Sequence, residues 1–312
     1  VMSKAITQNR LEQKKKNVEQ YKESRIRLSS TVIHRALEIQ VETTSKCNLR
    51  CPMCYIDALQ RDDNRKAADY GRTTELTQEV VEKIGPFLNT AVIAYLHGVG
   101  EPMLSPILFS LIAKAKAEGA MVWFSTNGTV MTNEQATLLV ELLVDRVQFS
   151  LSAGTPETFE TVHGGAKFET VLCNIRRLHE RRIELGSRLP ELTINFVAQG
   201  RNLEELPLLV STVRDLGISL IDVKPLVPVD RFPENSYAQR QKRNYDPLVD
   251  EPIFRDACSI AGSCGINIDA SYYRNSVPQF PVISHASLGH CLQPFRMMYV
   301  NRFGKVFPCC VG

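Results

Sequence analysis

The sequence of 312 residues predicts an α/β protein, an open (βα)6 partial TIM barrel with a small cysteine-rich C-terminal extension. Three observations lead to this prediction. Short apolar runs alternate with amphipathic segments between residues 37 and 226, as in parallel strands joined by helices. Six such units fit an open barrel better than a closed eight-stranded one. After residue 226 prolines and charges replace the alternation, and cysteines gather towards the end.

The strands and helices of the barrel follow from this alternation. In chain order, the predicted strands are Leu37–Val41, Ala91–Leu96, Met121–Ser125, Arg146–Leu151, Leu192–Val197 and Leu220–Lys224. In the same order, the predicted helices are Glu75–Leu88, Ile107–Ala117, Asn133–Val144, Phe168–Leu185 and Leu203–Leu216. Thr73 and Thr74 can cap the first helix, and Gly119 and Gly217 end the second and the fifth. Ligands in such folds bind at the C-terminal ends of the strands, so a site is expected in the loops that follow them.

The pattern divides the chain into four parts. Residues 1–36 are a basic helical arm, 37–226 the barrel, 227–257 a linker or extra helix, and 258–312 the cysteine-rich extension. The net charge is +3, but residues 1–35 alone carry nine Lys and Arg against three Glu. We expect a surface helix that packs on the main domain. Contact with an acidic peptide or a nucleic acid is the alternative that this charge allows, and nucleic acid is not the partner we expect.

Composition indicates a cytoplasmic protein with no membrane partner. Hydrophobic residues make up 44% and charged residues 23% of the chain, which is ordinary for a soluble globular protein. No apolar run approaches the roughly 20 residues that span a bilayer. The first 30 residues are polar and basic, unlike a signal peptide. In a reducing compartment the nine cysteines indicate metal binding or catalysis.

The strongest functional signal directly follows the first predicted strand. Cys47, Cys51 and Cys54 have the spacing C-x3-C-x2-C. Three thiolates bind three irons of a [4Fe–4S] cluster and leave the fourth open, whereas clusters that only carry electrons normally have all four irons capped by protein. A zinc site would need a fourth ligand nearby, and the nearest histidines are His34 and His97.

This motif at the end of a first strand resembles that of the radical S-adenosylmethionine (SAM) superfamily. The resemblance implies that SAM binds the open iron through its amino and carboxylate groups. It also implies that the reduced cluster cleaves SAM to methionine and a 5′-deoxyadenosyl radical, which abstracts a hydrogen atom from the substrate. The family usually has an aromatic residue before the third cysteine, and this chain has Met53 there.

Residues after the second and third strands resemble further SAM-binding motifs. The segment 99–102, Val-Gly-Glu-Pro, is similar to the family's Gly-Gly-Glu-Pro. Gly100 would let the backbone approach the ligand, and Glu101 would help to fix the SAM ammonium group, partly through backbone carbonyls. Ser125 and Asn127 lie in a segment similar to Thr-Asn-Gly and offer hydrogen bonds to the SAM carboxylate or ribose. An ordinary turn is the alternative for both motifs.

The fourth and fifth strands add further candidates. Ser150 matches a ribose-contacting serine of related families. Asn195 is a polar residue among apolar neighbours, so it needs a partner, either the ribose or a neighbouring main-chain group. His163 begins a His-Gly-Gly run where relatives often have Arg-Gly. It would either meet the SAM carboxylate or cap a turn.

The second strong signal is C-terminal. Cys291 and Cys309 form the pattern C-x12-G-x4-C around Gly304, and Cys310 is adjacent. Residues 298–309 indicate a β-hairpin. This segment resembles the start of the SPASM or twitch extension of radical SAM enzymes, in which the hairpin supplies the first ligands of an auxiliary Fe–S cluster. A hairpin with buried cysteines and no cluster is the alternative.

The further ligands of this auxiliary cluster stay open. Either they lie beyond residue 312, or Cys310, Cys258 or Cys264 takes their place. Cys258 and Cys264 are also our candidates for a catalytic role as hydrogen-atom donors. A third interpretation gives these two cysteines no function at all.

Together these features predict a radical SAM enzyme of the SPASM/twitch group with an electron donor such as flavodoxin or ferredoxin. Only 36 residues precede the first strand, whereas peptide-modifying relatives often begin with a longer leader-binding domain. We therefore expect oxidation or epimerisation of a small molecule. The alternatives are a peptide or protein maturase whose basic helix grips its target, and a non-catalytic metal-binding module.

Overall fold

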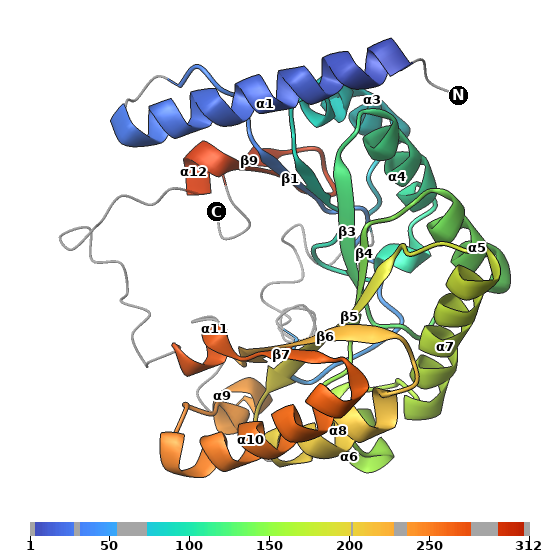
Figure 1. Cartoon of the computed structure of the whole chain (residues 1–312), viewed down its shortest axis with the longest axis vertical. Helices are drawn as coiled ribbons and strands as arrows, with labels where there is room; N and C mark the ends of the chain where they lie inside the picture. The colour runs from blue at the N-terminus through green and yellow to red at the C-terminus, as the bar shows by residue number, and fades with distance from the viewer. Residues whose placement is uncertain are drawn as a thin grey trace.

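The computed structural model describes residues 4–27, 32–54, 74–200, 202–227, 236–275 and 293–308. A curved nine-stranded sheet in the order β7-β6-β5-β4-β3-β2-β1-β8-β9 forms its centre (Figure 1). Strands β1 to β6 are neighbours in chain order and are parallel, and β7 and β8 extend the sheet in parallel at its two ends. The sheet does not close on itself. The predicted open (βα)6 partial barrel is therefore confirmed.

The predicted strands and helices of the barrel are present, with ends that differ by a few residues. The strands are β1 (Glu38–Val41), β2 (Ile93–Tyr95), β3 (Met121–Thr126), β4 (Arg146–Ser150), β5 (Glu191–Ala198), β6 (Ile218–Pro225), β7 (Asn267–Asp269), β8 (Met297–Val300) and β9 (Val306–Phe307). The helices are α1 (Lys4–Arg27), α3 (Gln78–Leu88), α4 (Leu108–Ala117), α5 (Asn133–Glu141), α6 (Pro156–Val162), α7 (Phe168–Glu184), α8 (Leu206–Val213), α9 (Tyr237–Gln241), α10 (Pro247–Cys264), α11 (Ser271–Arg274) and α12 (Gln293–Arg296). Two short 3-10 turns, Pro102–Leu104 and Asn202–Glu205, follow β2 and β5.

The two faces of the sheet differ in polarity because side chains alternate along a strand. Phe124, Val147 and Phe149 lie on the face that the helices cover, and they are buried in the main hydrophobic core. The alternate residues are partly exposed on the concave face, and many are polar. Ser125 and Gln148 are examples: their side chains hydrogen-bond across β3 and β4, with 3.0 Å between Oγ and Oε1. The barrel thus has an apolar outer layer and a polar interior.

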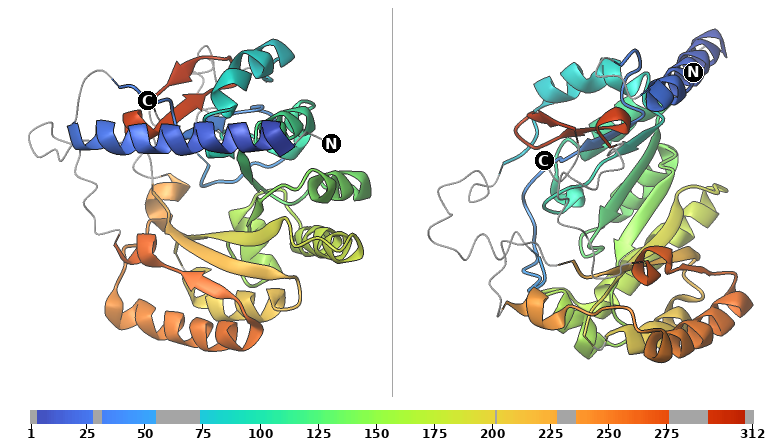
Figure 2. Two further views of the ribbon diagram at one scale, coloured as in Figure 1. Left: turned by 45° about the horizontal axis from the view of Figure 1, so that its top comes forward. Right: turned by 90° about the vertical axis from the view of Figure 1, so that its left-hand side faces the viewer.

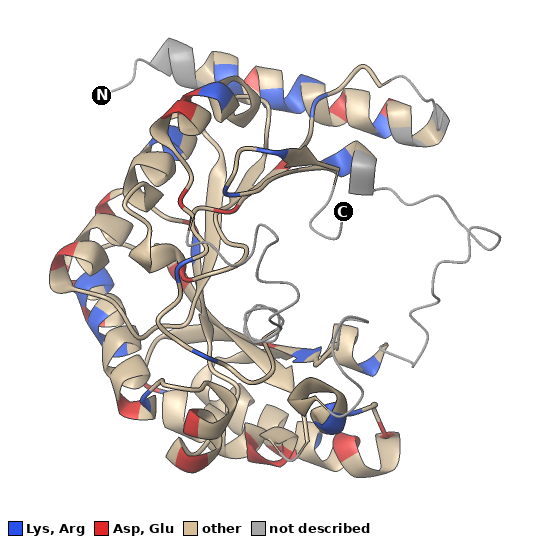
Figure 3. Cartoon of the chain, turned by 180° about the vertical axis from the view of Figure 1, so that it is seen from behind, with Lys and Arg blue, Asp and Glu red and all other residues tan. Residues whose placement is uncertain are grey.

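Helix α1 rests on the end of the barrel where the strands begin. The buried Lys14 Nζ donates to the carbonyls of Leu88, 2.9 Å away, and Ala91, at the C-terminal end of α3 and just before β2. Asn17 Nδ2 donates to Thr90 O over 3.2 Å. Acidic residues are interspersed with the basic ones along the helix (Figure 3). The expected surface helix is therefore held by specific polar contacts.

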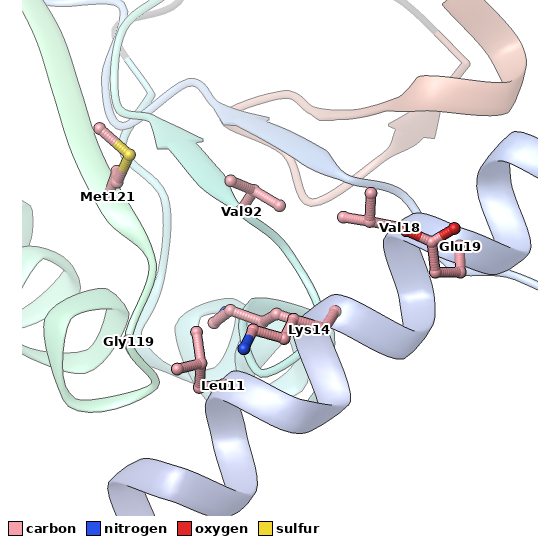
Figure 4. A pocket seen from close by; sticks show the side chains of 8 residues that line it. Leu11, Lys14, Val18, Glu19, Val92, Gly119 and Met121 are labelled. Carbon is pink, nitrogen blue, oxygen red and sulfur yellow. The ribbon is translucent and has the colours of Figure 1, made fainter.

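A pocket of about 330 Å³ separates α1 from the starts of β2 and β3 (Figure 4). Leu11 and Val18 line it from the helix, and Val92 and Met121 line it from the barrel. The pocket lies at the N-terminal ends of the strands, so it does not belong to the loops in which a site is expected. Among the helices in the ranges given above, none combines the length and the apolar character needed to cross a membrane.

The segments after β6 lie at two opposite edges of the sheet (Figures 1 and 2). Helix α10 packs on α8, and β7 joins β6. The expected limit between the linker and the extension, at residues 257 and 258, falls inside α10. At the other edge β8 joins β1 and forms an antiparallel hairpin with β9. The predicted C-terminal hairpin is present, and Gly304 lies in its turn with φ of +75°.

Candidate metal and cofactor site

The three-cysteine motif lies on the loop after β1, at the edge of the sheet where the parallel strands end. Cys47, Cys51 and Cys54 are all partly buried, and the amide of Cys54 donates to the carbonyl of Cys51 over 2.9 Å. Burial raises the pKa of the Cys47 thiol, and the charges of Glu101 and Cys54 raise it further. The irons of a cluster would supply the positive charge that a buried thiolate needs. The donor set therefore fits an Fe–S cluster.

The contacts around these thiols agree with a cluster loop. Asn127 Nδ2 lies 4.0 Å from Cys47 Sγ and 3.0 Å from Asn48 Oδ1, so the loop after β3 contacts the motif directly. In the parts of the chain given above, no three His, Cys, Asp or Glu side chains converge as they would on a single metal ion. A [4Fe–4S] cluster does not require such convergence, because each of its thiolates binds a different iron.

Gly100 brings the Val-Gly-Glu-Pro segment onto the residues that precede Cys47. Its φ of +80° is a conformation that favours glycine. A Cβ at this position would lie 2.6 Å from Thr44 O and 2.7 Å from Lys46 O. The amide of Glu101 donates to the same Lys46 carbonyl over 2.7 Å. Gly100 therefore lies directly against the cysteine loop, and the expected approach of its backbone to the ligand stays a prediction.

The Glu101 carboxylate joins the loops after β2 and β3. It is 2% exposed and accepts hydrogen bonds from Met103 N over 3.0 Å, Thr126 Oγ1 over 2.7 Å and Asn127 N over 2.6 Å. Burial raises the pKa of Glu101, and the three donors act in the opposite direction. The side chain is therefore occupied within the protein. The expected contact of Glu101 with SAM stays a prediction.

The His163-Gly164-Gly165 run contacts the cysteine loop from the other side. The amide of Arg50 donates to Gly164 O over 2.8 Å, and a Cβ on Gly164 would lie 2.5 Å from Arg50 O. His163 itself is 3% exposed, packs against Phe159 and accepts a hydrogen bond from the amide of Ser152 at Nε2 over 3.4 Å. The sequence allowed His163 either to meet the SAM carboxylate or to cap a turn, and this geometry agrees with the second role.

The buried His163 predicts a pH-dependent stability. Burial lowers the pKa of His163 from 6.5 to about 4, so the folded state resists protonation more than the unfolded state. The contribution of neutral His163 to the free energy of unfolding is complete above pH 6.5 and is lost as the pH falls towards 4. The free energy of unfolding then falls by at most about 1.4 kcal/mol per pH unit. His163→Gln keeps an acceptor for Ser152 and does not titrate. We expect urea unfolding at pH 7 and pH 5 to show a smaller loss of stability in this variant, and equal losses would contradict the assignment.

Ser150 and Asn195 are direct neighbours on the concave face. The register pairs Ser150 with Asn195, and Asn195 with Asp222 on β6. Asn195 Oδ1 is buried and accepts no hydrogen bond in the residues that the structure describes. A ligand hydroxyl would satisfy this oxygen. The geometry thus agrees with the candidate ribose contact at Asn195, while Ser125 is instead bonded to Gln148.

Two further groups on this face were not singled out from the sequence as parts of the site. Lys224 Nζ forms an ion pair with Asp222 Oδ2 over 2.9 Å. Burial and the nearby Lys224 charge lower the pKa of His97 to about 4, and its buried Nδ1 has no hydrogen-bond partner among the described residues. Polar residues at alternate positions of otherwise apolar strands are the sequence signal that identifies such groups.

Of the remaining predicted cysteines, Cys258 and Cys264 are not brought to this site. Cys258 and Cys264 both lie on α10, which belongs to the outer helical layer; Cys258 is exposed and Cys264 packs partly against the core. Cys291, Cys309 and Cys310 lie outside the described residues. Their roles stay predictions.

An open parallel barrel with a three-cysteine loop at its strand ends defines a class of iron–sulfur enzymes. The family model described as the Radical SAM superfamily matches residues 41–206. The chain belongs to this superfamily, whose cofactors are a [4Fe–4S] cluster and SAM.

Similar proteins agree with this assignment. The chain is 29% identical over 214 residues to the tungsten-containing aldehyde ferredoxin oxidoreductase cofactor-modifying protein of Pyrococcus furiosus, covering 68% of this chain and 58% of that one. It is 29% identical over 185 residues to PqqA peptide cyclase of Streptomyces rochei, covering 59% and 46%. The chain thus spans about half the length of these relatives.

A solved structure has the same fold. SAM-bound SuiB of Streptococcus suis superimposes with a TM-score of 0.64 at 14% identity. The match covers 92% of this chain and 63% of SuiB.

Proposed function

We propose that this radical SAM enzyme oxidises or epimerises a small molecule that binds on the concave face of the barrel. The observation that carries the proposal is the loop of Cys47, Cys51 and Cys54, which backbone contacts hold at the strand ends from two sides. The three thiolates would hold the cluster and leave one iron for SAM. The bound cluster supplies the electron that cleaves SAM, and the radical chemistry is that of the cofactor.

In this proposal, the chain's own residues hold the cysteine loop in place and bind SAM. Glu101 and Asn127 join the loops after β2 and β3 to the cysteine loop. Asn195 Oδ1 would accept a ribose hydroxyl, and Ser150 would stand beside it. His97, with its pKa of about 4, is neutral at pH 7, so it would accept a hydrogen bond or donate one without carrying charge.

A small-molecule substrate is supported by the relative from Pyrococcus furiosus, which by its name modifies a cofactor. A peptide substrate is the second candidate, because PqqA peptide cyclase is equally similar in identity. An auxiliary cluster on Cys291, Cys309 and Cys310 also remains part of the proposal, supported by the hairpin of β8 and β9 that precedes two of these residues. Flavodoxin or ferredoxin would donate the electron.

The proposed activity is tested with protein reconstituted anaerobically with iron and sulfide, reduced with dithionite and supplied with SAM. We expect methionine and 5′-deoxyadenosine as products. Absence of both from protein that holds a [4Fe–4S] cluster would contradict the proposal. Uniformly deuterated extracts, separated into metabolites and peptides, then distinguish the substrate classes. Deuterium in 5′-deoxyadenosine should come from the metabolite fraction, and transfer from the peptide fraction alone would favour the second candidate.

A further inference from the structure

A buried carboxylate links the C-terminal hairpin to the loop after β2. Glu42 directly follows β1 and is 1% exposed. Its Oε1 accepts hydrogen bonds from the amide of Val99 over 3.0 Å and from the hydroxyl of Tyr299 over 2.8 Å. Its Oε2 accepts from the amide of Arg302 over 3.1 Å and from Arg302 Nη1 over 2.9 Å. One side chain therefore contacts β8, the hairpin turn and the loop after β2.

The ion pair between Glu42 and Arg302 is almost completely removed from water. The two side chains are 1% and 2% exposed. An ion pair in such a place adds little net stability, because desolvation offsets the attraction, but removing either partner leaves a buried charge. The Arg302 guanidinium also lies over the Phe303 ring, 4.5 Å from its centroid. These contacts hold the turn of the hairpin in one position against Glu42.

The same carboxylate shapes the path of the cofactor loop. Val99, whose amide it binds, directly precedes Gly100. A Cβ on Gly98 would lie 2.6 Å from Glu42 Cγ, so the loop passes as close to Glu42 as a glycine allows. Gly100 in turn packs on the carbonyls just before Cys47. A continuous series of contacts thus runs from the hairpin through Glu42 to the cysteine loop.

We propose that Glu42 is a positioning residue, through which the β8–β9 hairpin holds loop 98–101 against the cysteine loop. The proposal rests on the proposed function only for the identity of the cofactor at this loop. The conformation of the loop is a property of the chain alone. A change in the hairpin should therefore alter SAM binding without removing any group that touches SAM.

The test compares two arginines that both join β1 to the C-terminal segment. Arg302→Met breaks the ion pair at the end of β1, whereas Arg296→Met breaks the pair with Glu38 at its start, where Nε and Oε1 are 2.9 Å apart. We expect hydrogen exchange of amides 97–101 in cofactor-free protein to accelerate about tenfold in Arg302→Met, because the Val99 hydrogen bond is weakened. The Kd for SAM of reconstituted Arg302→Met should rise about tenfold at unchanged iron content. Arg296→Met should change neither value.

Tyr299→Phe provides a milder variant, since it removes one donor to Glu42 and keeps the ring. It should accelerate exchange in the same segment, by less than Arg302→Met. If amides 97–101 exchanged at the wild-type rate in both Arg302→Met and Tyr299→Phe, the proposal would be overturned. The exchange experiment needs no cofactor, so a wild-type protein that fails to cleave SAM would contradict the proposed function and leave this result intact.

Discussion

Replacing Cys47, Cys51 or Cys54 with alanine is expected to abolish SAM cleavage. Each thiolate binds a different iron of the cluster, so any one substitution removes a third of the protein ligands and leaves a second iron uncapped. Iron and sulfide content should fall, and 5′-deoxyadenosine should not rise above the background of a reaction without protein. Chromatography of the products and a colorimetric iron assay make both measurements.

The matched control for these variants is Cys173→Ala, since Cys173 is exposed on α7. We expect this variant to retain both iron and activity. The three cysteines are only partly buried, so the three site variants should keep the far-UV circular dichroism spectrum of the wild type. Retained SAM cleavage in any one of them would show that the assignment of these cysteines to the cluster is wrong.

Gly100→Ala is expected to have the second largest effect, because it adds both backbone strain and a collision. A non-glycine residue with φ near +80° costs about 1–2 kcal/mol. The added Cβ would also lie within 2.7 Å of two carbonyl oxygens next to Cys47, which must move away. We expect a loss of several-fold in both iron retention and SAM affinity, together with a lower free energy of unfolding.

Gly186→Ala separates the two causes. Gly186 also has a positive φ, +62°, but a Cβ there would meet nothing within 4 Å. This variant should lose about the same free energy of unfolding to backbone strain and retain its iron and SAM binding. If Gly100→Ala lowered iron retention, SAM affinity and the free energy of unfolding no more than Gly186→Ala does, the close contact between Gly100 and the cysteine loop would have no role in cofactor binding.

The barrel was predictable from the sequence because the pattern that indicates each strand and helix arises within that element. Strands such as β4 (Arg146–Ser150) must bury one face under helices, so their apolar periodicity appears in the sequence itself. The pairing of the C-terminal strands with the barrel sheet was not predictable in this way. β8 was predicted as a strand of the hairpin, but its pairing with β1, from the far end of the chain, was not, and neither was the pairing of β7 with β6. Their pairing depends on which sheet edges the folded barrel leaves open.

The candidate site shows the same division. The spacing of Cys47, Cys51 and Cys54 indicated a cluster, because the number of thiolates and the gaps between them are sequence properties. Glu101 is different: the motif suggested a ligand contact, whereas three protein donors surround its carboxylate. A single sequence does not reveal which donors reach a side chain, since they come from residue 103 after β2 and from residues 126 and 127 at the end of β3.

The sequence by itself therefore determined the open barrel, the position of the cysteine loop after the first strand, and membership of the radical SAM superfamily. Only the tertiary structure decided that Gly100 and Gly164 hold this loop from two sides, and that Glu42 joins it to the hairpin. The physical reason is distance along the chain. Periodicity and ligand spacing act within a few residues, whereas Glu42 and Arg302 become partners only when β8 pairs with β1.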